Sequence, residues 1–600
     1  MGGSSSYLLG GTCRCQLQHS LLERFKEMTK ELRTEVLIVG GGLGGCAAAL
    51  AVCRSGRTAI VTEPTDWIGG QLTSQAVPPD EHGWIEQFGA TASYRRLRTL
   101  VRQYYRDHYR LTRRAQDDPY LNPGLGWVSP LCHEPRVALA VLEAMLAPYR
   151  TSGLLTILQQ HVPVSTETAA GDRIAAVTLE NRLSGGQLTI TADYVLDATE
   201  LGDLLPLAGA EFVTGQESQS QTGEPGAPDV ARPQNSQAMT VCFAVDHMVG
   251  ENHTIDRPAE YEFWRDFVPP LNPPWAGKLV RLTGLSPRTL EPVHYRFDPT
   301  GEPPVAFSGL WTYRRILARE QFTPGSFPSD ICLINWPMTD YLLGDLCTCD
   351  TEQAKKHIER AKQLSLSLLY WLQTEYERED GGRGLPGLRL RPDIVGTADG
   401  LAKAPYIRES RRIEAEFTVC QQHLSADLRE GKLLAEAFDD SVGIGSYRID
   451  LHPTTGGDNY FDVPTLPFQI PLGALIPVRM ENLLPAAKNL GVTHITNGCY
   501  RLHPVEWSVG EAAGALSCFC LAQNSSPRGV LHNNRQLVAF QDSLVQQGIE
   551  LQWPSDLNLQ EGEPHRHGMN GPGGCDHNRQ TLILPLGGRF RSAEADRFFK

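Results

Sequence analysis

The chain contains 600 residues, more than one hydrophobic core usually holds, so we expect two lobes. Hydrophobic residues make up 41% and charged residues 21%, as in an ordinary globular protein, and no run of eighteen apolar residues occurs, so no membrane-spanning helix is expected. The formal net charge of −14 argues against a general nucleic-acid binder, because phosphate contacts need a basic surface.

The first residues, MGGSSSYLLGGTCRCQLQHS, lack the positively charged start and the apolar core of a secretory signal. They match the myristoylation pattern M-G-x-x-x-[ST], but the match consists of common small residues. We therefore expect residues 1–33 to be a flexible leader.

Fourteen cysteines fall as scattered singles and three C-x-C pairs, and no C-x-x-C occurs. A disulfide framework, a zinc ribbon and a ferredoxin-type cluster are therefore not expected, and reduced thiols in a cytoplasmic protein are the simplest interpretation. Near the C-terminus a few metal-ligand types lie irregularly in a glycine-rich stretch, so no metal site is predicted from His565, His567, Cys575 and His577.

Residues 36–64, VLIVGGGLGGCAAALAVCRSGRTAIVTEP, predict a buried strand, a glycine turn, a helix, a second strand and a terminal acid. The turn satisfies G-x-G-x-x-G, whose bare backbone admits a pyrophosphate to the N-terminus of the helix. Glu63 follows Gly45 by eighteen residues, where a carboxylate accepts hydrogen bonds from an adenosine ribose and disfavours NADP. The predicted dinucleotide contacts here are Gly40, Gly42, Leu43, Gly44, Gly45, Glu63 and Pro64.

The layout of the following segments distinguishes the two common dinucleotides. An NAD enzyme would complete its fold with a second mononucleotide half, whereas residues 161–197 predict a β-meander, and dinucleotide-type motifs return only near residue 476. The predicted fold class is therefore α/β, with a Rossmann-like domain that contains a parallel sheet and an inserted β-meander, plus an inserted α+β substrate domain. A sheet assembled from distant segments suits an elongated FAD.

Four stretches resemble the FAD-dependent oxidoreductase family, glutathione-reductase-like Rossmann flavoproteins related to fumarate reductase and succinate dehydrogenase flavoproteins. They are EPTDWIGGQLTSQA (63–76), ADYVLDATELGDLLPLAGAEF (192–212), YIRESRRIEAEFTV (406–419) and the segment 476–522. The resemblance implies FAD as the cofactor. It also implies further contacts at Gly69, Gly70, Gln71, Leu72, Val162, Ala198, Thr199, Gly202, Asp203, Asn489, Leu490, Ala512 and Ala513.

Two positions depart from the family pattern. Ala486-Ala487-Lys488-Asn489 stands where the family commonly has A-G-R-N, and Glu200 stands where a glycine is frequent. We therefore do not carry over Lys488 or Glu200 as cofactor contacts.

The expected domains follow from these motifs. They are a leader (1–33), an FAD-binding domain in two parts (34–215 and 465–525), an inserted substrate or cap domain (216–464), and a C-terminal helix with an irregular tail (526–600). Residues 215–237 contain almost no large apolar side chain and are predicted to be a mobile loop or crossover. Residues 351–379 predict a long helix whose apolar face belongs to the core.

Between Ser93 and Arg114 lie eight arginines and a single acid, Asp107, with apolar residues at helical spacing. We interpret this segment as an amphipathic helix whose solvated basic face packs on acidic neighbours. A docking surface for an anionic substrate or partner is the alternative.

Residues 493–507, THITNGCYRLHPVEW, would connect the late cofactor turn to a helix rich in small residues beside the flavin. Histidine suits acid–base chemistry near neutral pH, and arginine can hold a carboxylate with two hydrogen bonds. The catalytic candidates are His494, Tyr500, Arg501 and His503. The candidate substrate contacts are Arg408, Glu409 and Arg411, although an internal ion-pair network that includes Arg412 explains them equally well.

The predicted function is that of an FAD-dependent oxidoreductase, a dehydrogenase or oxidase that transfers a hydride from a small organic substrate to flavin N5. A flavin monooxygenase is an alternative, but it needs NAD(P)H, and outside residues 40–45 the G-x-G-x-x-G pattern occurs only at residues 382–387, after a predicted helix rather than a strand. A non-catalytic flavoprotein or RNA-modification partner that uses residues 95–114 is another, which the overall acidity opposes. We expect a small-molecule substrate and no nucleic acid as partner.

Overall fold

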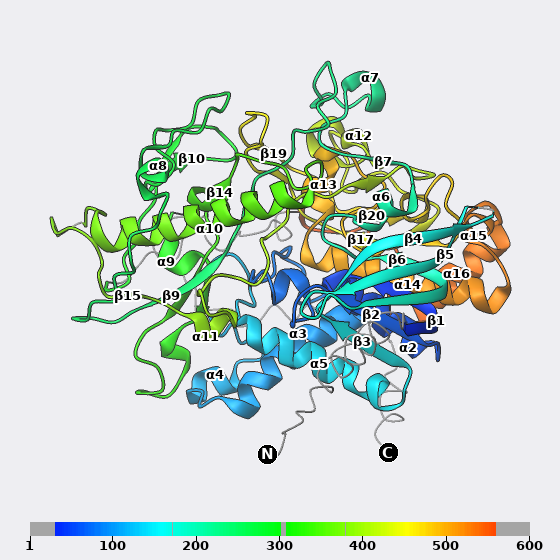
Figure 1. The fold of residues 1–600 in the computed structure, drawn as a ribbon, viewed down its shortest axis with the longest axis horizontal. Helices are drawn as coiled ribbons and strands as arrows, with labels where there is room; N and C mark the ends of the chain where they lie inside the picture. The colour runs from blue at the N-terminus through cyan, green and yellow to red at the C-terminus, as the bar shows by residue number, and fades with distance from the viewer. Residues whose placement is uncertain (1–29, 171, 302–307, 379, 560–600) are drawn as a thin grey trace, which may run out of the picture.

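The framework of one lobe is a seven-stranded sheet among the residues that the computed structural model describes, which are 30–559 without 171, 302–307 and 379 (Figure 1). β1 (Lys30–Val39) lies at its centre, with β2 (Ala59–Glu63) and β3 (Leu155–Gln159) parallel to it on one side. β1 begins at Lys30, inside the segment expected to be a leader. The myristoylation pattern and the histidine-containing tail lie outside the described residues.

β6 (Gln187–Asp197) divides this sheet into two regions. It runs parallel to β1 over its whole length, whereas its other edge changes partner halfway. Its first half pairs with β5 (Arg173–Asn181), which continues into β4 (His161–Ala169), and its second half pairs in parallel with β21 (Leu483–Pro485). The predicted parallel sheet with an inserted meander, completed by a distant segment, is confirmed.

The apolar run of β1 serves two cores, because successive side chains of a strand point to opposite faces. Val36 and Ile38 pack into the main core, and Leu37 and Val39 pack into a smaller core beneath the meander. All four side chains are fully buried, as the continuous apolar run predicts for a central parallel strand.

Two glycine-rich helices cover the main-core face of the sheet. α2 (Leu43–Arg54) packs along α14 (His503–Gln523) through small residues on both helices. A Cβ atom on Gly510 would lie 2.0 Å from the carbonyl oxygen of Gly44, and one on Gly514 would lie 2.7 Å from that of Ala48. The two backbones approach closely because these positions lack side chains.

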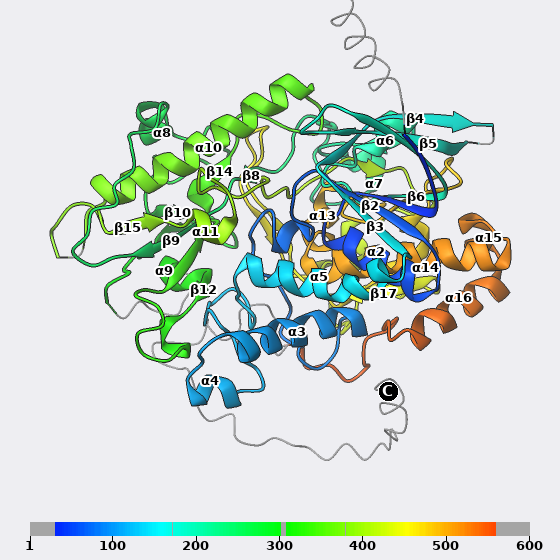
Figure 2. The ribbon, with the colours of Figure 1, turned by 60° about the horizontal axis from the view of Figure 1, so that its bottom comes forward.

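The arginine-rich segment forms α3 (Ala92–His108) and α4 (Arg113–Asp117), and α5 (Pro135–Thr151) lies between α3 and α2 (Figure 2). Arg98 and Arg102 are buried and form ion pairs: Arg98 with Glu81 and Glu86, and Arg102 with Glu86. The acidic neighbours are confirmed for these two arginines, but their burial contradicts the solvated face that we expected.

The second lobe, beside the first in Figure 1, has its own sheet, which packs one face into the main core and the other into a second core. Its strand order is β12 (Arg315–Leu317), β13 (Ile331–Ile334), β9 (Phe243–His247) and β15 (Leu388–Leu390). α10 (Thr351–Thr374) packs into the second core through the predicted apolar face, where Leu364, Leu368 and Leu372 are buried.

Short elements complete both lobes. The helices are α6 (Leu204–Ala208), α7 (Gln219–Thr222), α8 (Tyr261–Asp266), α9 (Leu310–Tyr313), α11 (Pro392–Val395), α12 (Gln421–Leu424), α13 (His494–Tyr500), α15 (Pro527–His532) and α16 (Asn534–Gln546). The strands are β7 (Phe212–Val213), β8 (Met239–Thr240), β10 (Thr283–Leu285), β11 (Pro292–His294), β14 (Asp340–Tyr341), β16 (Arg412–Ile413), β17 (Ser441–Gly445), β18 (Ile449–Leu451), β19 (Phe461–Val463) and β20 (Phe468–Pro471). Among the described residues, no helix combines the length and apolar character needed to cross a bilayer.

The crossover over residues 215–237 contains the short helix α7 and is tied to the rest of the protein by polar side chains. Gln216 donates to Asp458 at 2.9 Å, Arg412 donates to Glu217 at 2.9 Å, and Thr493 donates to Glu224 at 2.7 Å. Polar hydrogen bonds therefore hold this segment in place although it has no apolar core, and its composition alone does not predict them.

We expect Gly510→Ala to destabilise the protein by about 3 kcal/mol, because the added methyl group meets the rigid backbone of Gly44 rather than a movable side chain. The measurement is the free energy of unfolding in urea without added cofactor. Gly186→Ala is the control, because that residue is exposed and the nearest atom to its new Cβ is Ser184 Oγ at 3.3 Å. Equal stability of the two variants would contradict the close packing of α2 on α14.

Candidate active site

The turn between β1 and α2 is held against two other segments of the chain. Gly40 has φ +108°, and a Cβ on it would lie 2.1 Å from the carbonyl oxygen of Ala198, after β6. A Cβ on Gly44 would lie 1.9 Å from the carbonyl oxygen of Ala486, after β21. The glycines are therefore required by close backbone packing, and they also leave the N-terminus of α2 without side chains.

Glu63 ends β2 and reaches this turn. Its carboxylate accepts hydrogen bonds from the Thr65 N–H at 2.9 Å and the Thr65 hydroxyl at 2.7 Å, and a Cβ on Gly41 would lie 2.9 Å from its Oε2. Burial raises the pKa of Glu63 to about 7 although the Thr65 hydrogen bonds oppose the shift. The predicted acid thus lies beside the glycine turn, as ribose recognition requires.

A second glycine turn, at Gly69 and Gly70, lies against the first. Both residues have positive φ, +105° and +48°, and the Gly69 N–H donates to the Gly41 carbonyl at 2.7 Å. One oxygen of Glu200 lies between the turns, because a Cβ on Gly42 or Gly70 would lie 3.0 or 2.8 Å from it. This Oε1 is buried and has no hydrogen-bond partner.

Three charged side chains meet beside the two turns. Lys488 is fully buried, forms an ion pair with Glu200 and lies 3.8 Å from Glu506. Glu506 accepts a hydrogen bond from the Gly44 N–H at 3.2 Å, in the first turn of α2, and another from Gln71. Burial alone would lower the pKa of Lys488, but the two carboxylates raise it, so the lysine is charged.

Sequence reasoning set Lys488 and Glu200 aside and did not consider Glu506. The residues present nevertheless fit a dinucleotide: two turns without Cβ atoms face each other with a buried lysine beside them, and the Glu200 carboxylate between the turns would have to give way to the phosphate oxygens. The sequence did contain a signal for this pair: an acid replaces the family's glycine at Glu200, and a lysine replaces the family's arginine at Lys488.

The other predicted cofactor contacts surround this place at different depths. Thr199 caps the Asp197 carboxylate, Asn489 donates to the Asp197 carbonyl at 3.1 Å, and the Asn489 Oδ1 is buried without a partner. Ala512 and Ala513 are buried in α14, and Leu72 and Leu490 lie in the main core. Four positions remain. The Pro64 carbonyl accepts a hydrogen bond from Arg182, and Val162 of β4 pairs with Glu180 of β5. Gly202 and Asp203 lie in the loop after β6.

A cavity of about 230 Å³ lies between the lobes, and we call it the interlobe cavity. Asp80 comes from the first lobe, Arg314 and Arg408 come from the second, and Arg501 follows α13. Gln71, in the second glycine turn, donates to the Arg501 carbonyl at 3.0 Å, so the cavity adjoins the turns. Its aromatic lining consists of Trp127, Tyr295, Tyr313, Tyr406, Tyr447 and Tyr460.

The catalytic candidates do not lie together. Arg501 lines the interlobe cavity, where it donates to Tyr406 Oη at 3.1 Å and to the Asp450 carbonyl at 3.0 Å. His503 accepts a hydrogen bond from the Asp80 N–H at 3.0 Å, and burial lowers its pKa to about 4, so its ring is neutral at pH 7. The Tyr500 hydroxyl donates to the Gln469 carbonyl at 2.6 Å, so this hydrogen bond holds the side chain against the backbone of β20.

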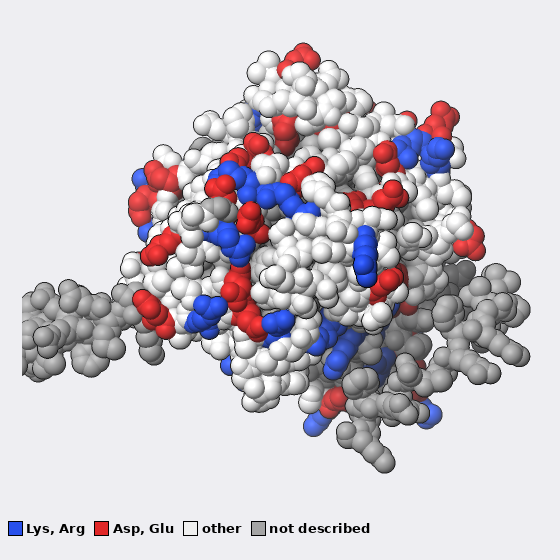
Figure 3. All heavy atoms as spheres, turned by 90° about the vertical axis from the view of Figure 1, so that its right-hand side faces the viewer, with Lys and Arg blue, Asp and Glu red and all other residues white. Residues whose placement is uncertain are grey.

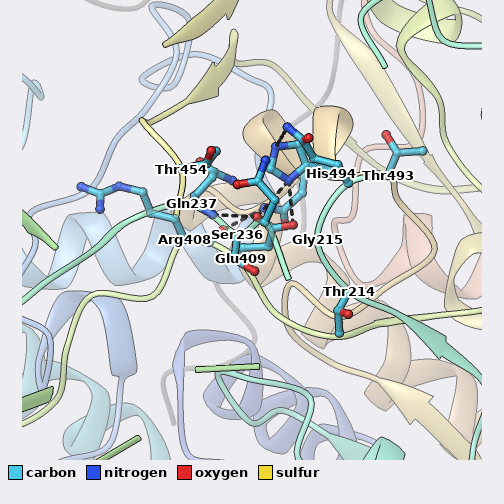
Figure 4. Close-up of polar contacts among 12 residues, drawn as sticks. Thr214, Gly215, Ser236, Gln237, Arg408, Glu409, Thr454, Thr493 and His494 are labelled. Atoms are coloured by element: carbon cyan, nitrogen blue, oxygen red, sulfur yellow. Dashed lines mark hydrogen bonds and ion pairs between the residues drawn. The ribbon is translucent and has the colours of Figure 1, made fainter. Parts of the chain in front are cut away.

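His494 faces a different cavity, of about 280 Å³, next to the crossover (Figure 4). Its Nδ1 lies 2.8 Å from Glu409 Oε1, and Glu409 also accepts from Arg412 at 2.6 Å. Burial would raise the pKa of Glu409, but His494 and Arg412 lower it to about 2. This cavity, which we call the crossover cavity, is also lined by Gln216, Glu217, Glu224, Arg232 and Asp458.

The candidate substrate residues separate in the same way. Residues 407–411 form neither a helix nor a strand, and Figure 4 shows Arg408 pointing away from Glu409 and His494. Arg408 lines the interlobe cavity, Glu409 belongs to the His494 cluster, and Arg411 pairs with Asp203 at 3.1 Å. Sequence reasoning missed Asp80, Arg314 and Trp127, for which no motif gives a signal.

The sheet, the two glycine turns and the ribose-side acid define a dinucleotide-binding flavoprotein. A family model described as FAD dependent oxidoreductase matches residues 35–544, so the chain belongs to this family and FAD is its cofactor.

Solved structures that match parts of the chain include glycerol-3-phosphate dehydrogenase from Bacillus halodurans complexed with FAD (14% identity, 38% of this chain and 42% of that chain, TM-score 0.21). Others are L-proline dehydrogenase from P. horikoshii (14%, 32% and 25%, TM-score 0.16) and a flavocytochrome c3 fumarate reductase (11%, 31% and 36%, TM-score 0.17). The chain spans less than half the length of each. No curated protein matches the sequence.

The raised pKa of Glu63 predicts a pH-dependent stability. The folded protein holds this proton up to about pH 7, whereas an unfolded glutamate loses it near pH 4.5, so the stabilisation is complete below pH 4.5 and is lost as the pH rises through 7. Between these values we expect Glu63 to remove about 1.4 kcal/mol per pH unit from the free energy of unfolding. Urea unfolding without FAD should show a smaller decline in Glu63→Gln than in the wild type. The exposed Glu167→Gln is the control, and an unchanged slope in Glu63→Gln would contradict the assignment.

Proposed function

We propose that this flavoenzyme is a dehydrogenase or oxidase that takes a hydride from a small organic substrate held in the interlobe cavity. The observation that carries the proposal is the segment Arg501–His503. Arg501 lines the cavity, and its carbonyl accepts the hydrogen bond from Gln71 in the second glycine turn. FAD supplies the hydride acceptor, flavin N5, and the protein supplies position and charge.

The two glycine turns are the proposed site of the pyrophosphate and ribityl portion of FAD, and Glu63 is the proposed ribose ligand. The support is the lack of Cβ atoms in both turns and the N–H groups of the first turn of α2. We assign Lys488 as the counter-charge for the pyrophosphate, because a buried dianion needs a partner. The other contacts implied by the family pattern stay predictions.

In the interlobe cavity, Asp80 is the group we assign to accept a proton from the substrate. Its backbone N–H is bound by His503, and its carboxylate lies 3.4 Å from Arg314. Because its ring is neutral and already engaged, His503 is a positioning residue for Asp80 in this proposal. Arg408 and Arg501 would orient the substrate through guanidinium hydrogen bonds.

The alternatives have less support. A flavin monooxygenase needs a second dinucleotide, and the interlobe cavity, at about 230 Å³, is too small to hold one. For an RNA partner, the buried ion pairs of Arg98 and Arg102 remove two of the eight arginines from the surface. On the face over α15, α16 and the meander, basic and acidic side chains are intermixed (Figure 3).

We expect Lys488→Met to weaken FAD binding at least tenfold, because the pyrophosphate would then face Glu200 and Glu506 without a buried cation. The measurement is the dissociation constant of FAD by fluorescence quenching, with circular dichroism as a check of folding. Lys362→Met, which removes the surface ion pair with Asp399, is the control and should bind FAD as the wild type does. A folded Lys488→Met with wild-type affinity would overturn the assignment.

Anaerobic screening of amines, alcohols and 2-hydroxy acids should identify a compound that bleaches the absorbance of the oxidised flavin. With that compound, we expect Asp80→Asn to slow flavin reduction by about 10²-fold or more, since it removes the proton acceptor. Asp458→Asn, in the crossover cavity, is the matched control and should reduce its flavin at a rate close to that of the wild type. The opposite ranking would move the active site to the crossover cavity, and NADPH-dependent oxygen uptake with substrate hydroxylation would favour the monooxygenase.

A further inference from the structure

The charges on the wall of the interlobe cavity differ in sign from those of the chain as a whole. Five arginines and three aspartates line it, together with His452, whereas the chain carries −14. The crossover cavity has the reverse balance, with Glu217, Glu224 and Asp458 against Arg232 and His494. The interlobe cavity is therefore a local basic site in an acidic protein.

Three of these arginines are buried and incompletely paired. Arg314, Arg408 and Arg501 are 8%, 2% and 2% exposed. Each contacts one carboxylate, at 3.4 Å to Asp80, 3.0 Å to Asp340 and 3.3 Å to Asp450, respectively. The Nε–H of each is buried without a hydrogen-bond partner, which is costly for a charged group.

Two of the guanidinium groups lie over aromatic rings that belong to the same wall. Arg314 lies 5.3 Å from the Tyr313 ring centroid, and Arg408 lies 5.1 Å from that of Tyr406. Trp127 stacks on Tyr313 with the ring planes 26° apart. These contacts hold the planar cations in fixed orientations and provide flat apolar surface beside them.

We infer that the interlobe cavity binds a small organic carboxylate with a flat, single-ring-sized body, its oxygens on the buried arginines and its body among the aromatic side chains. The inference rests on the proposed function only in taking the occupant of this cavity to be the substrate. A carboxylate supplies two acceptor oxygens to donors that lack them, whereas an ammonium group would be repelled and an alcohol would leave the guanidinium groups incompletely paired. The volume of about 230 Å³ equals the share of roughly eight water molecules, which limits the occupant to a small molecule.

The test uses the FAD-loaded protein and three probes of similar size: benzoate, benzamide and benzylamine. Binding is measured as perturbation of the flavin absorbance and by calorimetry, neither of which requires turnover. We expect benzoate to bind at least tenfold more tightly than either other probe. Arg501→Gln and Arg314→Gln should each weaken benzoate at least tenfold and leave benzamide nearly unchanged, and Arg232→Gln in the crossover cavity is the control.

The comparison of the three probes on the wild type covers the case in which these variants do not fold, because it needs no substitution. Equal affinity for the three probes overturns the carboxylate inference. If benzoate binds as expected and no compound in the screen reduces the flavin, the proposed function fails while the anion site stands. If a neutral alcohol or an amine reduces the flavin and benzoate does not bind, the proposed function stands and the carboxylate inference fails.

Discussion

Backbone-to-backbone contact at the first glycine turn determines how the rest of this lobe assembles. A Cβ atom would lie about two ångströms from a carbonyl oxygen at Gly40, Gly44, Gly45 and Gly510. These contacts join the turn to the end of β6, the end of β21 and the middle of α14. Because residues so far apart in sequence must meet here, the chain between β6 and β21 has to leave the sheet and return, and the second lobe occupies that excursion.

The same contacts bury acids at the ends of strands. Glu63 ends β2 and Asp197 ends β6, and each accepts hydrogen bonds from the N–H and hydroxyl of a threonine two residues later. Burial raises both pKa values to about 7 in spite of these bonds. A carboxyl group that loses its proton near neutral pH stands beside the place proposed for a dianionic cofactor, so the charge of the site depends on the solution pH and on the cofactor together.

Much of the cofactor lobe could be predicted from the sequence, because strand, glycine turn, helix and acid follow one another locally. The meander and the late return to the sheet were also predicted, since they leave periodic and compositional signals. Glu200 and Lys488 were set aside as separate departures from a family pattern, and the structure makes them one ion pair. Residues 288 positions apart cannot be paired by local reasoning, although two unusual charges of opposite sign were a usable hint.

The residues that line the interlobe cavity could not be grouped from the sequence, because they are brought together only by the tertiary fold. Three of its arginines are Arg314 after α9, Arg408 before β16 and Arg501 after α13, and only the packing of two lobes brings them together. Glu409, the residue after Arg408, points away from it and contacts His494 of the crossover cavity, so two neighbours in sequence belong to different clusters. The glycine contacts constrain the cofactor lobe residue by residue, whereas the cavity wall belongs mainly to the excursion, where side chains can change without disturbing the turns. In the proposed assignment, separate parts of one chain thus carry cofactor binding and substrate choice, and Arg501 joins them.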